Sequence, residues 1–148
     1  MKKLLGILVL GLLFCNTSFA DSLRVIDGDT IVLNGEKIRF SGIDTPELKQ
    51  TCMSGEEKVF CGKTAKMLLI KKIGNETPKC ISEGKDVYKR TLAECFVNGK
   101  SLSVFLVRSG YAFAYRKYSK KFIKDEEFAK KNNAGMWSME FEFPWDFR

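Results

Sequence analysis

The chain has 148 residues, which is the length of one domain, and a formal net charge of +7. A modestly basic balance favours a polyanionic partner without establishing one. The chain contains no histidine, which excludes Ser-His-Asp and Cys-His catalysis, histidine-ligated zinc and a histidine general base.

Residues 1–20 have the pattern of a secretory signal peptide. Two lysines (2–3) precede an apolar run (4–14), and a small-residue cleavage site follows at 18–20. The apolar run is too short to span a bilayer as a helix. We therefore expect an exported protein, periplasmic or extracellular, with no stable membrane anchor after cleavage. The mature domain, residues 21–148, keeps a charge of +5 because two lysines leave with the signal.

The stretch 24–47 predicts the order strand, turn, strand, hairpin, strand. Apolar residues at Ile31 and Leu33, and again at Ile38 and Phe40, have the period of two expected of half-buried strands. Asn34-Gly35 lies between these runs, and both residues tolerate the positive φ of a two-residue hairpin turn. The second and third strands should therefore pair.

Two acidic residues stand at the open ends of these strands. Asp29 precedes the second strand and Asp44 follows the third, so pairing can bring them together. Two adjacent carboxylates repel each other unless a cation lies between them. Oxygen ligands alone suit a hard ion such as calcium.

The rest of the chain alternates helical and strand patterns with polar connections. A polar loop is predicted at 48–57, followed by a helix at 62–73 that Gly74-Asn75 stops, and then by strands at 79–82 and 92–97 around a polar connection at 83–90. After these strands we expect a short helix capped by Ser101 and closed by Gly110, an aromatic and basic run at 111–118, an amphipathic helix at 121–131, and an aromatic segment at 141–148 that forms an ordered arm.

Five short strands, with one helix between the third and fourth and two more near the end, predict an α+β fold, mainly β. The leading candidate is a five-stranded Greek-key barrel of the OB-fold with about three helices, in one domain. A ferredoxin-like sandwich fits less well, because three strands come before the first helix.

Four cysteines remain in the mature domain, at positions 52, 61, 80 and 95. An even number in an exported chain indicates disulfides, and four cysteines allow three connectivities. The two predicted strands at 79–82 and 92–97 would place Cys80 near Cys95.

The combined motifs resemble the staphylococcal (micrococcal) nuclease family across essentially the whole mature chain. The residues that carry the resemblance are Asp27-Gly28-Asp29-Thr30, Arg39, Asp44-Thr45-Pro46-Glu47, Tyr88-x-Arg90, Leu106-Val107-Arg108-x-Gly110, the aromatic run 111–118, and Ala134-Gly135-Met136-Trp137. The resemblance implies an OB-fold barrel and a calcium-dependent hydrolysis of phosphodiester bonds in DNA and RNA that leaves 3′-phosphates.

The resemblance also implies a metal site. Asp29 and Asp44 would bind Ca²⁺ through their carboxylates and Thr45 through its backbone carbonyl. Asp27 would lie just outside the ligands of the metal.

By the same resemblance, Glu47 would be the general base that takes a proton from the attacking water. Arg39 and Arg90 would bind the phosphate and stabilise charge in the transition state, where arginine offers a planar fork that lysine lacks. Tyr115 and Tyr118 would flank a nucleotide, although half-buried packing explains them equally well.

Two features depart from the family pattern. Lys89 stands where the family often has glycine, beside Arg90. The four cysteines resemble those of exported bacterial relatives, and this likeness implies the pairs Cys52–Cys61 and Cys80–Cys95.

These observations predict an exported, monomeric, calcium-dependent endonuclease acting on DNA and RNA. A noncatalytic OB-fold module that binds nucleic acid or protein is the alternative. A third alternative is a secreted structural or inhibitor domain, which would need none of the proposed metal-binding and catalytic residues.

Overall fold

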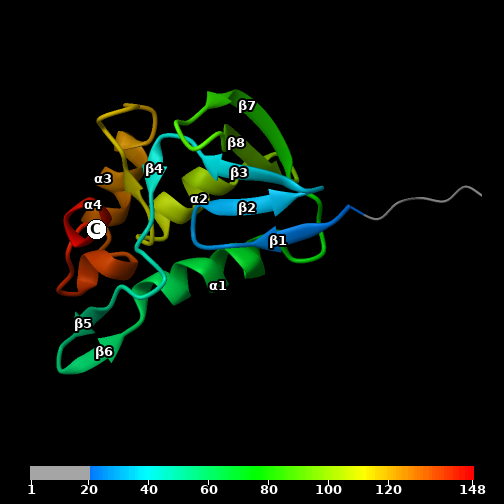
Figure 1. Cartoon of the computed structure of the whole chain (residues 1–148). Coiled ribbons are helices and arrows are strands. Elements are labelled where there is room, and N and C mark those ends of the chain that lie inside the picture. Colours follow the sequence, from blue (N-terminus) through cyan, green and yellow to red (C-terminus); the bar gives the residue numbers. More distant parts are fainter. Residues whose placement is uncertain (1–20) are drawn as a thin grey trace, which may run out of the picture.

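The computed structural model describes residues 21–148, so the predicted signal peptide lies outside the described residues. The centre of the structure is a six-stranded sheet with the order β1-β2-β3-β8-β7, in which β9 also pairs with β8 (Figure 1). The strands of this sheet are β1 (Leu23–Val25), β2 (Thr30–Leu33), β3 (Glu36–Phe40), β7 (Lys79–Lys85), β8 (Thr91–Val97) and β9 (Lys100–Ser101). A parallel pairing between β3 and β8 joins the two halves, and the other pairings are antiparallel. The α+β, OB-like prediction is confirmed.

The β2–β3 hairpin forms where the alternating pattern predicted it. Ile31 lies opposite Ile38, and Thr30 lies opposite Arg39. Asn34 and Gly35 have φ values of 50° and 82°, so the turn needs the two residue types that tolerate this region best. The register fixes which face each side chain of β3 occupies, and this places Arg39 near the end of β2 where Asp29 stands.

Four α-helices and one 3₁₀-helix are present in the described part of the chain. They are α1 (Cys61–Ile73), α2 (Leu102–Arg108), α3 (Ile123–Lys131), α4 (Pro144–Phe147) and the 3₁₀-helix η1 (Gly135–Ser138). The first three match the predicted helices to within two residues at each end. Ser101 caps α2 as predicted, because its hydroxyl accepts a hydrogen bond of 3.2 Å from the backbone N–H of Val104. None of these helices is both long and apolar enough to span a bilayer.

The main core lies between the sheet and the helices. Side chains of β2, β3 and β8 meet those of α1 and α2 there, and the largest fully buried members are Phe40, Phe122, Ile31, Ile43 and Leu69. On α1, Ala65, Leu69 and Ile73 are all buried and form the face that packs on the core. Burial of apolar area of this kind is the dominant stabilising term of the fold.

A second, smaller core holds the carboxy-terminal part of the chain. Phe113 lies on β10 (Phe113–Ala114), which pairs with β4 (Ile43–Asp44). Its ring stacks on Phe141 at 5.2 Å between centroids and meets Phe143 and Trp145 edge to face. The expected ordered arm, residues 141–148, is therefore packed beside β4, at the left of Figure 1.

The prediction of an irregular loop at 48–57 is wrong. This segment contains β5 (Cys52–Ser54), which pairs with β6 (Glu57–Val59) as a small hairpin. The polar composition of this segment gave no strand pattern, because partners that are distant in sequence stabilise the hairpin. For example, Met53 forms a β-bridge with Glu140 of the carboxy-terminal part. In addition, β7 runs three residues further than predicted, through a bulge between Ser82 and Gly84.

Both predicted disulfides are present. Cys52 pairs with Cys61 and thereby ties the β5–β6 hairpin to the start of α1. Cys80 pairs with Cys95, and these residues lie directly opposite each other on β7 and β8. The second disulfide braces the two strands whose connection carries Arg90.

Candidate active site

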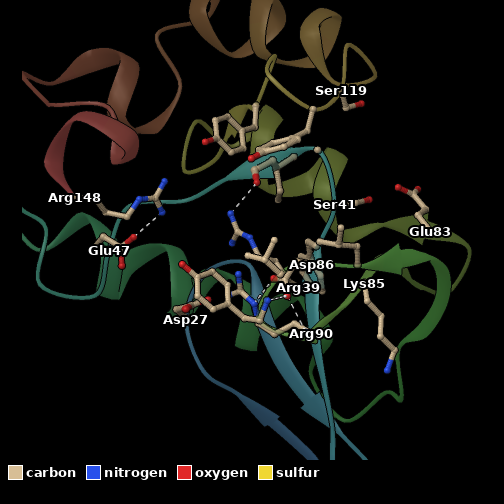
Figure 2. A pocket seen from close by; sticks show the side chains of 18 residues that line it. Asp27, Arg39, Ser41, Glu47, Glu83, Lys85, Asp86, Arg90, Ser119 and Arg148 are labelled. Atoms are coloured by element: carbon tan, nitrogen blue, oxygen red, sulfur yellow. Dashed lines mark hydrogen bonds and ion pairs between the residues drawn. The ribbon is translucent and has the colours of Figure 1, made fainter.

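A cleft of about 900 Å³ opens above the ends of β3 and β4 (Figure 2). Its walls combine basic, acidic and aromatic side chains. The residues that the argument uses are Asp27, Arg39, Glu47, Asp86, Tyr88, Arg90, Tyr115, Tyr118 and Arg148, and all of them line the cleft. The parts of the chain that meet here are far apart in sequence. They are the turn before β2, strand β3, the β7–β8 connection and the carboxy-terminal arm.

Asp29 and Asp44 come together on one guanidinium, as their places at adjoining strand ends predicted. Arg39 donates from Nη1 to Oδ1 of Asp29, and from Nη2 to Oδ1 of Asp44 at 3.0 Å. The two aspartates are 3% and 0% exposed. Buried carboxylates require compensating charge, so Arg39 is the group that allows both acids to be buried at this point.

The second oxygen of Asp29 fixes the chain beyond β4. Oδ2 accepts hydrogen bonds from the backbone N–H of Thr45 at 3.0 Å and from its hydroxyl at 2.9 Å. Asp27 plays a local role next to Asp29, because its Oδ1 accepts a hydrogen bond of 3.1 Å from the N–H of Asp29. Asp27 therefore supports the turn from which Asp29 projects.

The electrostatics of this group are strongly perturbed. Burial, with the nearby charge of Asp29, raises the pKa of Asp27 from 3.8 to about 6. Burial also raises the pKa of Asp44, although hydrogen bonds from Arg148 oppose the rise. Burial alone would lower the pKa of Arg39, but the adjacent Asp29 and Asp44 raise it above its ordinary value, so this guanidinium stays charged. Perturbed acids gathered in a cleft are typical of functional sites.

Glu47 lies at the rim of the cleft, beside Asp44. Its side chain is 40% exposed, so solvent reaches the carboxylate. Its backbone N–H donates a hydrogen bond of 3.1 Å to Oε1 of Gln50. Gly62 in the first turn of α1 packs so closely that an added Cβ would come within 1.8 Å of the carbonyl oxygen of Glu47. The start of α1 therefore fixes the backbone at this position.

Arg90 reaches the same cleft from the β7–β8 connection. Asp86 holds it in place, because its carboxylate accepts a hydrogen bond of 2.6 Å from Nε of Arg90 and another of 2.9 Å from the backbone N–H of Arg90. The guanidinium also lies over the ring of Tyr88, 5.4 Å from the centroid. Lys89 takes a φ of 63°, in the left-handed region that glycine adopts readily. Lysine therefore accepts the glycine-type conformation at this point, and the loop still presents Arg90 to the cleft.

Tyr115 and Tyr118 also line the cleft. Their rings meet edge to face at 5.0 Å between centroids. Tyr118 is 70% exposed, whereas Tyr115 is half-buried and stacks on Trp145 of the arm at 5.7 Å. The structure thus places both rings within the cleft, and their role toward a nucleotide stays a prediction.

Arg148 is a residue of the cleft that sequence reasoning missed. Its Nη1 lies 2.8 Å from Oε1 of Glu47 and 3.2 Å from Oδ1 of Asp44, and its Nη2 pairs with Oδ2 of Asp44. Figure 2 shows this side chain reaching down to Glu47, apart from Arg39 and Arg90. The aromatic spacing of 141–148 indicated an ordered arm, but no pattern in the sequence indicated where the arm ends.

The donor set fits a hard divalent cation with oxygen ligands. Asp29 and Asp44 offer carboxylate oxygens close together, and no imidazole or thiolate competes with them, because the chain lacks histidine and the four cysteines of residues 21–148 form disulfides. Within residues 21–148, no group of three His, Cys, Asp or Glu side chains is arranged to hold a metal ion.

Comparisons with known proteins agree with the motif resemblance. A family model described as staphylococcal nuclease homologue matches residues 37–139. The succinoglycan biosynthesis protein ExoI of Rhizobium meliloti (strain 1021) is 33% identical over 117 residues, which are 76% of this chain and 61% of that protein. Endonuclease YncB of Bacillus subtilis (strain 168) is 33% identical over 127 residues, which are 78% of this chain and 59% of that protein.

An uncharacterized endonuclease of Haemophilus influenzae (strain ATCC 51907 / DSM 11121 / KW20 / Rd) is 27% identical over 122 residues, which are 78% of this chain and 64% of that protein. The chain thus spans less than two thirds of the length of these relatives.

Proposed function

Because the chain belongs to the staphylococcal nuclease family, we propose that it is a calcium-dependent endonuclease that hydrolyses phosphodiester bonds in DNA and RNA and leaves 3′-phosphates. One observation carries the proposal: Asp29, Asp44, Glu47, Arg39 and Arg90 gather in and beneath a single cleft. A fold used only for binding has no need of buried acids beside an exposed carboxylate and two arginines. Relatives named as endonucleases support the same reaction class.

Asp29 and Asp44 would hold the calcium ion, together with the backbone carbonyl of Thr45. Asp29 accepts two hydrogen bonds from Thr45, one from its backbone N–H and one from its hydroxyl, and this contact supports assigning both residues to one site. When bound, calcium supplies a Lewis acid that polarises a phosphoryl oxygen and orients a water molecule.

Glu47 would act as the general base. Its carboxylate is partly exposed, stands beside Asp44 and is reached by water from the cleft. It would take a proton from water as the water oxygen bonds to phosphorus and the bond from phosphorus to the 5′-oxygen breaks. The 5′-oxygen would leave with the bonding electron pair and take up a proton from water in the cleft. A carboxylate is the appropriate base in a chain without histidine.

Arg39 and Arg90 would bind the phosphate and stabilise the charge that builds on its nonbridging oxygens. Each guanidinium is held by carboxylates, Arg39 by Asp29 and Asp44, and Arg90 by Asp86. Donors that are positioned before the reaction need little reorganisation during it, and this is the main source of transition-state stabilisation.

We further propose that the protein acts as an exported monomer, periplasmic or extracellular, without a membrane anchor. Support comes from the signal-like segment at 1–20 and from the two disulfides, because such bonds persist in oxidising compartments.

The test is cleavage of plasmid DNA and of RNA by the purified protein with calcium, and then with a calcium chelator. Asp44→Ala, which removes a proposed ligand, serves as the control for contaminating nucleases and should be inactive while remaining folded. Cutting that needs calcium supports the proposal. Binding of nucleic acid without cutting would instead identify a noncatalytic module.

A further inference from the structure

Arg148 occupies a position that the proposed reaction needs for another group. Asp44 is fully buried, and both of its oxygens are engaged by arginines: Oδ1 by Arg39 and Arg148, and Oδ2 by Arg148. The same Arg148 guanidinium contacts Glu47 at 2.8 Å. A positive group thus lies between the proposed ligand and the proposed base, which is where a divalent cation would have to approach.

The arm is built to hold this arginine in place. The rings of Phe143, Trp145 and Tyr115 form a continuous stack, with interplanar angles of 7° and 5°. The side chain of buried Gln50 donates a hydrogen bond of 2.6 Å to the carbonyl oxygen of Glu142. These contacts fix the backbone of the arm up to Trp145, three residues before Arg148, so the arginine projects from an anchored segment.

The Arg148 contacts are also the exchangeable part of the site. Arg39 is 14% exposed and is held between two buried aspartates, whereas the Arg148 side chain is 42% exposed. The Arg148 guanidinium regains water when it separates from Asp44, and the buried Asp44 then keeps the charge of Arg39 beside it. A dication can therefore displace Arg148 much more readily than it can displace Arg39.

We propose that Arg148 is a further positioning residue of the active site, which holds Asp44 and Glu47 in the metal-free enzyme and gives up that place when the cation binds. The identity of the cation rests on the proposed function. A cation that must displace a tethered competitor binds with an affinity reduced by the fraction of molecules in which the site is open. The arm thereby sets the cation concentration at which the enzyme becomes active.

The experiment is a calorimetric titration of calcium into the whole protein, without nucleic acid. Arg148→Gln should lower the Kd for calcium at least fivefold. Arg148→Lys keeps the charge but loses the bidentate fork, and should lower the Kd at least threefold. The control is Arg108→Gln, because Arg108 is an exposed arginine that pairs with Asp125 at 3.5 Å and does not line the cleft. This variant should bind calcium like the unaltered protein.

A second readout follows the arm itself. In a Trp137→Phe background, the emission of Trp145 should change as calcium binds, because release of Arg148 alters the stack on Tyr115. With Arg148→Gln added, the calcium-free spectrum should already resemble the calcium-bound one. A residue that only stabilises the fold would change neither this spectrum nor the Kd.

Three outcomes would overturn the exchange. The first is a Kd for calcium of Arg148→Gln within twofold of that of the unaltered protein. The second is a Kd of Arg148→Lys within twofold of it, which would mean that only the charge at this position matters, and the third is a Trp145 emission spectrum that does not change when calcium is added. Failure of the proposed function is seen separately, as calcium binding without cleavage of nucleic acid. Absence of calcium binding in every variant would overturn both proposals.

Discussion

Replacement of Glu47 by glutamine is the change that best separates catalysis from binding. Glutamine keeps the size of the side chain and an oxygen that can still accept from Arg148, whose Nη1 lies 2.8 Å from Oε1. It removes the charge and the ability to take a proton. Loss of a positioned base lowers rates by roughly 10²–10⁴-fold, which corresponds to about 2.7–5.5 kcal/mol of transition-state stabilisation.

The structure limits the other effects of the same substitution. In the ion pair between Glu47 and Arg148, the two side chains are 40% and 42% exposed, respectively. Loss of this pair should therefore change the free energy of unfolding by only about 0–1 kcal/mol. The drop in kcat should therefore greatly exceed any change in stability. Calcium binding, measured by calorimetry, should survive, because the proposed carboxylate ligands Asp29 and Asp44 are unchanged.

The assay is the pH–rate profile of oligonucleotide cleavage at saturating calcium, for the unaltered protein and for Glu47→Gln. Saturation matters because Asp27 and Asp44 also have raised pKa values, and the bound cation suppresses the protonation of its ligands. Glu56→Gln, in the exposed turn of the β5–β6 hairpin, removes the same charge outside the cleft and should cut normally. If Glu47→Gln cuts within tenfold of the unaltered protein and keeps the same acid limb, Glu47 is not the base.

Arg39→Lys and Arg90→Lys should each lower kcat severely with a smaller change in KM, since lysine lacks the planar fork; near-normal kcat in steady-state assays would reassign that arginine to structure. Removing the Cys80–Cys95 disulfide by a double alanine substitution should reduce stability by about 3 kcal/mol in urea unfolding, because the bond closes a loop of 15-residue separation; an unchanged midpoint would contradict this. The pKa of Asp27 is about 6 in the folded protein and 3.8 ordinarily, so between about pH 4 and 6 the folded state binds a proton that the unfolded chain has released, and stability falls as pH rises. In a calcium chelator, Asp27→Asn should therefore stabilise the protein by about 1–3 kcal/mol at pH 7 and much less at pH 4; equal shifts in urea unfolding at both pH values would refute this.

The parts of the fold that sequence predicted are those set by local chemistry. Asn34-Gly35 makes the hairpin because of its own backbone preferences, and the spacing of Ala65, Leu69 and Ile73 produces the buried face of α1. The β5–β6 hairpin was missed because its order depends on a disulfide and on a bridge to Glu140, far along the chain. Long-range partners of this kind leave no periodic signal in the strand that they stabilise.

The same distinction applies to the candidate site. The approach of Asp29 to Asp44 followed from the strand ends on which they stand, and the structure joins them through Arg39. The place of Arg148 depends on a stack of aromatic rings between the arm and Tyr115, a tertiary contact that the spacing of the arm does not encode. The tie between Asp86 and Arg90 was accessible in principle, because an aspartate four residues before an arginine can accept from its side chain and its backbone.

The charges of the site explain how it can be folded before a cation arrives. Asp29 and Asp44 are buried, and burying them without compensation would cost several kcal/mol for each charge. Arg39 supplies compensation from within the sheet, and Arg148 supplies more through a side chain that is partly exposed. Because Arg39 already lies between the two acids, the proposed release of Arg148 would leave them with a positive charge beside them. If the proposed cation binds here, a site arranged in this way would keep Asp29 and Asp44 in position while the cation exchanges, which a site balanced by the metal ion alone could not do.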